Sequence, residues 1–197
     1  MALRVKDFYN THYKRFDSSR YRVWKAVREF VENIPKNSFV FESGCGNGKN
    51  LIYMNNHGIK TCGIDFSYRL VDICKKKGLN VDEADIRSLP YKDNTFDYVI
   101  SIAVIHHLHR EKDRIKSINE MIRVCKPGGK ILVSCWSVEQ EADSKRNFVF
   151  GDNSVKWVDT ERYYYIYDEI HIKEFLKNFN VEKLFWEKGN WFFILST

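Results

Sequence analysis

The chain has 197 residues, of which 44% are hydrophobic and 29% are charged, and its formal net charge is +6. This length allows one domain with a substantial core but not two full-sized domains. No apolar run approaches the roughly 18 residues that a membrane span needs. The charges within the first seven residues are not typical of a secretion signal. Five cysteines without a C-x-x-C pair indicate free thiols rather than disulfides or a zinc site. We therefore expect a soluble protein of the cytoplasm or the nucleus, with no membrane partner.

The first 36 residues carry most of the net charge, with nine Lys or Arg against four Asp or Glu. Helices are predicted over 5–16 and 22–33, the second because apolar residues recur at helical spacing. A turn over 16–20 separates them in this prediction. The basic residues of this helical preface, 1–36, form either a solvated helical face or a positively charged surface that binds nucleic acid. Composition alone does not distinguish the two.

After residue 36 strands and helices alternate, which is typical of a parallel sheet covered by helices on both faces. The predicted strands are 38–42, 61–64, 80–83, 96–102 and 130–135, and the predicted helices are 48–54, 68–77 and 111–125. Residues 126–129 should stop the last helix and turn the chain. Residues 139–165 are polar and are predicted to form an irregular insert near the site. A helix over 170–179 and strands over 181–185 and 191–195 close the chain. We expect one α/β domain over 1–197 with a seven-stranded, mostly parallel, Rossmann-like sheet.

A glycine loop, Gly44–Gly48, directly follows the first predicted strand, which ends near Glu42. Glycines let a backbone adopt positive φ and approach a ligand closely, and ligands of such sheets bind outside the carboxyl ends of the strands. The dinucleotide fingerprint G-x-G-x-x-G would need glycine at position 49, which is Lys49. The observed pattern, acidic-x-G-x-G-x-G, instead resembles the first motif of class I methyltransferases.

Two more acids follow at strand ends, Asp65 and Asp85, about 20 residues apart. Each alone could merely cap a helix or turn. In the resembled class, Asp65 would meet a ribose diol, Asp85 an adenine amino group, and the backbone N–H after it the adenine ring. Together and in this order they indicate binding of S-adenosyl-L-methionine. The cofactor residues that this resemblance implies are Glu42, Gly44, Cys45, Gly46, Asp65, Phe66, Asp85, Ile86 and Ala103.

The segment Asp97-Tyr-Val-Ile-Ser-Ile-Ala-Val-Ile-His-His-Leu108 resembles the eukaryotic tRNA wobble-uridine carboxymethyl methyltransferases. Further segments agree with that family, namely 16–20, 70–74, 136–141, 162–164 and 189–191. One departure is Glu42, which stands where many relatives have Asp, so the charge is kept. The region between 141 and 162 matches poorly. An Asn/Asp-Pro-Pro-aromatic stretch, common in enzymes that methylate nitrogen, is replaced by Ser-Ile-Ala-Val at 101–104.

The resemblance implies esterification of 5-carboxymethyluridine at the tRNA wobble position. A carboxylate is already anionic at neutral pH, so the site needs no general base. It must align the carboxylate with the methyl donor and partly desolvate it. We expect catalytic roles for Arg20, His106 and Arg162, and substrate contacts from Trp136, Tyr163, Tyr164 and Asn190. Each also has a structural alternative: a solvated arginine, a packed histidine, a core tryptophan, a strand edge or a hairpin residue.

The resembled family works with a small zinc-binding activator protein that adds a strand beside the sheet-edge strand, here Leu79–Glu83. The alternative is a solvated edge guarded by Asp82 and Glu83. Two other functions remain open. One is a methyltransferase for a small-molecule carboxylic acid, and the other is a non-catalytic binding subunit that keeps the fold.

Overall fold

A computed structural model describes residues 2–157 and 160–197 and centres on a mixed sheet of seven strands, in the order β3-β2-β1-β4-β5-β9-β8. The strands β1 to β5 are mutually parallel, whereas β9 is antiparallel to β5 and β8. Their bounds are β1 Phe39–Ser43, β2 Lys60–Asp65, β3 Val81–Glu83, β4 Phe96–Ile102, β5 Cys125–Trp136, β8 Val181–Glu187 and β9 Asn190–Ser196. This arrangement confirms the predicted Rossmann-like α/β fold.

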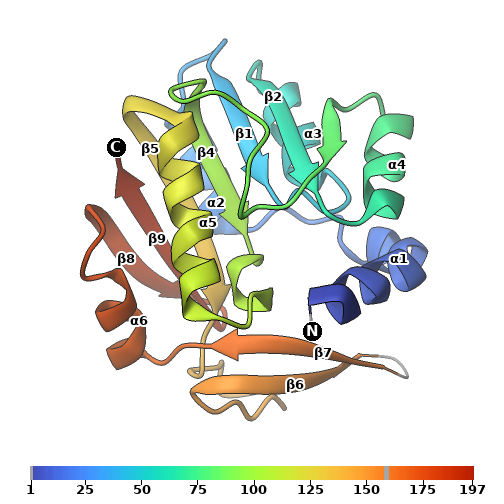
Figure 1. Ribbon diagram of the computed structural model, residues 1–197, viewed down its shortest axis with the longest axis vertical. Helices are drawn as coiled ribbons and strands as arrows, with labels where there is room; N and C mark the ends of the chain where they lie inside the picture. Colours follow the sequence, from blue (N-terminus) through green and yellow to red (C-terminus); the bar gives the residue numbers. More distant parts are fainter. Residues whose placement is uncertain (1, 158–159) are drawn as a thin grey trace.

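Helices cover both faces of the sheet because successive side chains of each strand point to opposite sides. Val40 belongs to the apolar cluster that includes residues of α2, α3 and α4, whereas its neighbour Phe41 belongs to the cluster that includes residues of α5 and α6. Figure 1 shows α5 and α6 in front of the sheet. The helices are α1 Ala2–Ser19, α2 Lys25–Glu32, α3 Lys49–Asn56, α4 Tyr68–Lys76, α5 Glu111–Val124 and α6 Glu169–Leu176, with a short 3-10 helix η1 at Ile105–His107. No helix in the described part of the chain is both long and apolar enough to cross a membrane.

The N-terminal preface differs from its prediction in two places. The helix predicted over 22–33 begins only at Lys25, because Trp24 is extended, with φ −69° and ψ 153°. Residues 16–19, predicted as part of a turn, form the last turn of α1, and the chain leaves the helix at Arg20. The hydroxyls of Ser18 and Ser19 donate to the carbonyls of Arg15 and Phe16, so they bond back into the helix rather than cap the next one. The helix α1 is kinked at His12, where φ is −104° and ψ is 18°.

Residues 126–129 were predicted to stop the helix and turn the chain into the next strand. The helix does end at Val124 and Gly128 adopts a positive φ of 78°, but these residues already belong to a strand. Strand β5 already begins at Cys125, which pairs with Phe96, and the register shifts before Lys130 pairs with Tyr98. A Cβ at Gly129 would lie 2.5 Å from the carbonyl oxygen of Asp97. Gly129 is therefore required for the close approach of β5 to β4.

The second half of the predicted irregular insert is regular. Strands β6 Gly151–Trp157 and β7 Thr160–Ile166 pair antiparallel as a separate two-stranded sheet, called here the β6–β7 ribbon. Residues 158 and 159 of the predicted insert lie outside the described residues. In β7 the buried side chains are Arg162, Tyr164 and Ile166, at every second position. Figure 1 shows the ribbon crossing below the carboxyl ends of the parallel strands.

Candidate active site

A cavity of about 770 Å³ opens at the carboxyl ends of the parallel strands, between the glycine loop, α1, the α1–α2 connection and the β6–β7 ribbon. Its wall includes all but one of the residues that the sequence singled out. The exception is Tyr163, whose side chain lies on the other side of β7 and whose hydroxyl donates to Asp152 at 2.6 Å. The residues brought together are Arg20, Glu42, Gly44, Cys45, Gly46, Asp65, Phe66, Asp85, Ile86, Ala103, His106, Trp136, Arg162, Tyr164 and Asn190.

The glycine loop is shaped by close contacts that no larger residue would allow. Gly44 has φ of +84°, and a Cβ there would lie 2.5 Å from a methyl group of Val104. Val104 follows Ala103, which itself adopts a positive φ of 60°. A non-glycine residue in this conformation is uncommon and recurs at functional sites. The end of β4 thus folds back onto the loop and narrows the cavity there.

Asp65 holds the glycine loop and also faces the cavity. Its Oδ2 accepts the N–H of Gly46 at 2.9 Å, and its Oδ1 accepts the N–H of Ser67 at 2.9 Å. Burial raises the pKa of Asp65 to about 6, although these backbone bonds act to lower it. Each carboxylate oxygen has a second lone pair, so Asp65 can still accept from the hydroxyls of a ribose.

The carboxyl group of Glu42 is buried, and only one of its two oxygens has a hydrogen-bond partner among the described residues. Its Oε1 accepts Nδ2 of Asn50 at 2.6 Å, whereas its Oε2 has no partner among the described residues. Burial raises the pKa of Glu42 to about 8. A buried carboxyl group with a free oxygen suits a ligand that brings positive charge. S-adenosyl-L-methionine carries both a sulfonium and an ammonium group, so the residues present fit this cofactor.

Asp85 is ionised because Arg87 binds it. Partial burial acts to raise the pKa of Asp85, but the bonds from Arg87 outweigh it and lower that pKa. The Arg87 guanidinium donates from Nε to Oδ1 at 2.9 Å and from Nη2 to Oδ2 at 2.5 Å, and it also pairs with Asp113. An ionised carboxylate at the cavity wall can accept a hydrogen bond from an adenine amino group. The sequence did not predict that Arg87 keeps Asp85 ionised.

Arg162 provides positive charge at the opposite end of the cavity. Only 5% of it is exposed, and no carboxylate pairs with it among the described residues. The rings of Phe8, Trp157 and Tyr164 surround its guanidinium at 4.8, 5.1 and 5.3 Å, and its Nε has no partner in the described chain. Arginine stays charged in proteins, and a buried charge is unfavourable unless it is paired. This end of the cavity is therefore built for an anion.

His106 is a neutral donor rather than a base. Its Nδ1 accepts the backbone N–H of Trp136 at 3.1 Å, so the ring proton lies on Nε2. Only 1% of His106 is exposed, and burial holds its pKa well below the usual value.

Arg20 is partly exposed and lies beside the glycine loop, since its carbonyl accepts a hydrogen bond from Nδ2 of Asn47 at 2.9 Å.

Trp136 and Tyr164 form a stacked pair, with ring centroids 4.3 Å apart and planes at 17°. One face of the indole is thus already covered, which favours a wall of the cavity over a free stacking platform. Asn190 is buried beside this pair, because it is the register partner of Trp136. Its Oδ1 has no hydrogen-bond partner among the described residues.

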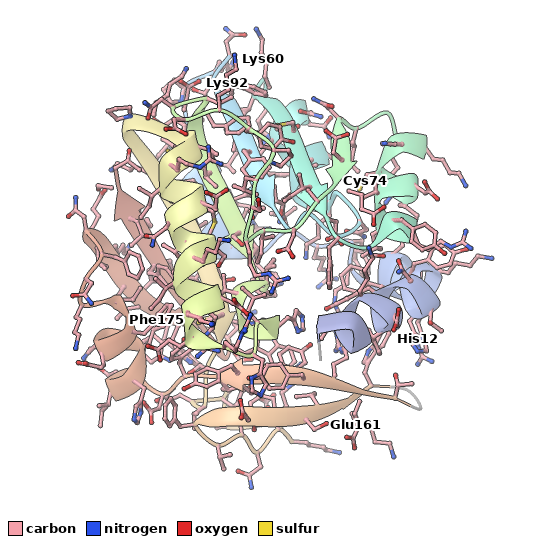
Figure 2. All side chains as sticks on the ribbon, viewed as in Figure 1. His12, Lys60, Cys74, Lys92, Glu161 and Phe175 are labelled. Carbon is pink, nitrogen blue, oxygen red and sulfur yellow. The ribbon has the colours of Figure 1, made fainter. Side chains whose placement is uncertain are left out.

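Helix α1 contributes to the site in a way that the sequence did not indicate. Tyr9 lines the cavity and contacts both His107 and Arg162. Figure 2 shows His12, on the same helix, close to the β6–β7 ribbon, and its ring lies 5.9 Å from that of Trp157. These contacts join segments between about 100 and 150 residues apart, so no local sequence pattern could have predicted them.

Comparison with known proteins gives consistent matches. Residues 41–133 match the model of a family described as a methyltransferase domain. A protein of Encephalitozoon cuniculi named "Putative methyltransferase" is 35% identical over 174 residues, covering 83% of this chain and 80% of that protein. An Arabidopsis thaliana tRNA (carboxymethyluridine(34)-5-O)-methyltransferase is 43% identical over 140 residues, covering 71% of this chain and 34% of that protein.

Solved structures share the fold. A protein described as "the putative methyltransferase", solved in complex with the Haloferax volcanii Trm112 methyltransferase activator, superimposes with a TM-score of 0.75 at 16% identity. The match covers 98% of this chain and 96% of that one. The present chain spans only about a fifth to a third of the length of the first curated relatives that it matches.

Binding of S-adenosyl-L-methionine should release about one proton at pH 7. Glu42, with a pKa of about 8, is mostly protonated in the free protein, and a cationic ligand favours its ionised form. Affinity should therefore rise with pH up to about 8, by at most about tenfold per pH unit for one proton. Calorimetry at pH 7 in two buffers of different ionisation enthalpy measures the release. The variant Glu42→Gln should lose it, and a wild-type titration without proton release would contradict the assignment.

Proposed function

Because this chain belongs to the methyltransferase family that includes the tRNA (carboxymethyluridine(34)-5-O)-methyltransferases, and whose cofactor is S-adenosyl-L-methionine, we propose that it esterifies 5-carboxymethyluridine at the tRNA wobble position. The product is 5-methoxycarbonylmethyluridine. The observation that carries the proposal is Arg162, a buried arginine in the cavity wall without a carboxylate partner among the described residues. A carboxylate acceptor supplies the missing negative charge.

The protonation states around the cavity support an acceptor that arrives already anionic. A carboxylate oxygen that takes a methyl group from a sulfonium forms an ester, and no proton is transferred. His106 cannot serve as a base, because its Nδ1 is occupied by a backbone N–H and its Nε2 carries the proton. That Nε2–H and the Arg162 guanidinium can both orient a carboxylate, since each donates hydrogen bonds.

The positive charge around the cavity supports RNA as the substrate, rather than a free small-molecule carboxylic acid. Tyr21, at the α1–α2 connection, is 70% exposed, and the guanidinium of Arg22 lies 5.6 Å from its ring. Besides Arg162, six basic residues line the cavity and have no carboxylate partner among the described residues, namely Arg20, Arg22, Arg28, Lys49, Arg146 and Lys188. Such cations bind phosphates, and exposed aromatic rings stack on bases.

The proposal extends to a protein partner at the edge of the sheet. In the described part of the chain β3 pairs with β2 alone, and Asp82 and Glu83 are exposed. An open edge can accept a strand from another protein. The neighbour of the same fold is itself in complex with the Haloferax volcanii activator, which supports an activator protein as the partner here. That this partner is small and binds zinc is part of the proposal and follows from the family resemblance alone.

The direct test is methyl transfer from S-adenosyl-L-methionine to tRNA that carries 5-carboxymethyluridine, followed by nucleoside mass analysis. We expect 5-methoxycarbonylmethyluridine, in higher yield when the activator is co-purified with the chain. Methylation of free carboxylic acids but not of tRNA would instead indicate the small-molecule alternative. Failure to bind the cofactor would indicate a non-catalytic subunit.

The unpaired basic residues of the cavity wall lead to a second prediction. The double variant Arg22→Gln/Arg28→Gln should weaken tRNA binding and lower the slope of log affinity against log salt by up to about two, because each lost phosphate contact lowers it by about one. The control is Lys60→Gln/Lys92→Gln, which removes two charges outside the cavity wall, at the end of the molecule away from the β6–β7 ribbon (Figure 2). Equal salt slopes in both variants would place the RNA elsewhere.

A further inference from the structure

The Arg162 guanidinium is held by a chain of hydrogen bonds that crosses three distant segments. The backbone carbonyl of Tyr163 contacts Nδ1 of His107 at 3.0 Å. Nε2 of His107 contacts the hydroxyl of Tyr9 at 2.9 Å. The Tyr9 hydroxyl in turn accepts Nη1 of Arg162 at 3.2 Å. Helix α1, the 3-10 helix η1 and strand β7 are thereby joined at the anion end of the cavity.

The donor and the acceptor of each of these three hydrogen bonds follow from the chemistry of the groups. A carbonyl oxygen can only accept, so Nδ1 of His107 carries the proton and donates it to Tyr163. Burial lowers the pKa of His107 to about 3, so the ring is neutral and Nε2 must accept. Tyr9 therefore donates its hydroxyl proton to His107, and its oxygen is free to accept from Arg162. Burial also raises the pKa of Tyr9, which keeps the phenol protonated.

The ring of Tyr9 has a separate set of contacts that does not depend on its hydroxyl. It meets Phe8 and Phe16 edge to face at 5.3 Å each, and His107 at 5.6 Å. Removing the hydroxyl alone should leave this packing in place. The oxygen is the part of Tyr9 that orients Arg162, because the remaining neighbours of the guanidinium are aromatic faces, which fix its distance but offer no lone pair.

We propose that Tyr9 and His107 are positioning residues that hold Arg162 in the orientation that binds the acceptor carboxylate. This inference rests on the proposed function, because it requires an anionic acceptor at Arg162. The bond from Nη1 to Tyr9 fixes the plane of the guanidinium, while its Nε stays without a partner among the described residues. The basic preface thereby forms part of the acceptor site itself, in addition to presenting charge to RNA.

Tyr9→Phe tests the proposal with the loss of one oxygen atom. We expect kcat for tRNA methylation to fall by about 10- to 100-fold, because small misplacements of a binding group cost up to about that much. The KM for S-adenosyl-L-methionine should stay unchanged. The melting temperature should fall by only a few degrees, because the ring packing stays while Nε2 of His107 and Nη1 of Arg162 lose a partner. The control is Tyr13→Phe, the same substitution one turn along α1, where the ring lies against Arg69. In an Arg162→Lys background, Tyr9→Phe should have little further effect, because both changes remove one function.

A second readout does not depend on turnover. In protein labelled with ¹⁵N-arginine, the Nε–H resonance of Arg162 is assigned by its loss in Arg162→Lys. It should be sharp in the wild type and in Tyr13→Phe, and shifted or broadened in Tyr9→Phe. An unchanged resonance together with unchanged kcat in Tyr9→Phe would overturn the positioning role while leaving the proposed function intact. A wild type that leaves 5-carboxymethyluridine unmethylated would refute the proposed function, and the resonance would still report whether Tyr9 orients Arg162.

Discussion

The buried, unpaired charge of Arg162 is the constraint on which the arrangement of this cavity depends. A guanidinium removed from water and left without a carboxylate is unfavourable. Its surroundings among the described residues lower that penalty without neutralising it, because aromatic faces attract a cation and the Tyr9 hydroxyl accepts one of its protons. Negative charge from a bound acceptor would complete the site. The two neighbouring histidines add no charge, since both are held neutral by burial.

Charge is divided along the cavity in a way that matches the two reactants. The acids Glu42, Asp65 and Asp85 stand at the ends of β1, β2 and β3, where a positively charged methyl donor fits. Arg162 stands at the other end, on the β6–β7 ribbon. The two groups of opposite sign therefore favour one orientation of donor and acceptor, and alignment of this kind is the main requirement of a reaction that needs no base. The ribbon and α1 close this end of the cavity together.

The cofactor end could be predicted from the sequence because its determinants are local. The glycine loop and the two later acids each follow a strand, and parallel strands bring their carboxyl ends to one edge. The acceptor end could be predicted only as a set of residue types. The ribbon was missed because the polar sequence of β6 hides its pairing with β7. Tyr163 was grouped with its neighbours, although the alternation of a strand sends its side chain away from Arg162 and Tyr164. The role of Tyr9 depends on contacts across 98 and 153 residues, which no local pattern encodes.

The claim that this site aligns an acceptor that is already anionic, without a general base, is tested most directly by the pH dependence of single-turnover methyl transfer to tRNA at saturating cofactor. The account predicts a rate that is flat from about pH 6 to 8.5 and falls only below about pH 5, where the acceptor carboxylate becomes protonated. A rate that rises with a midpoint near 6.5, the ordinary pKa of histidine, would show that a base takes part and would contradict the account.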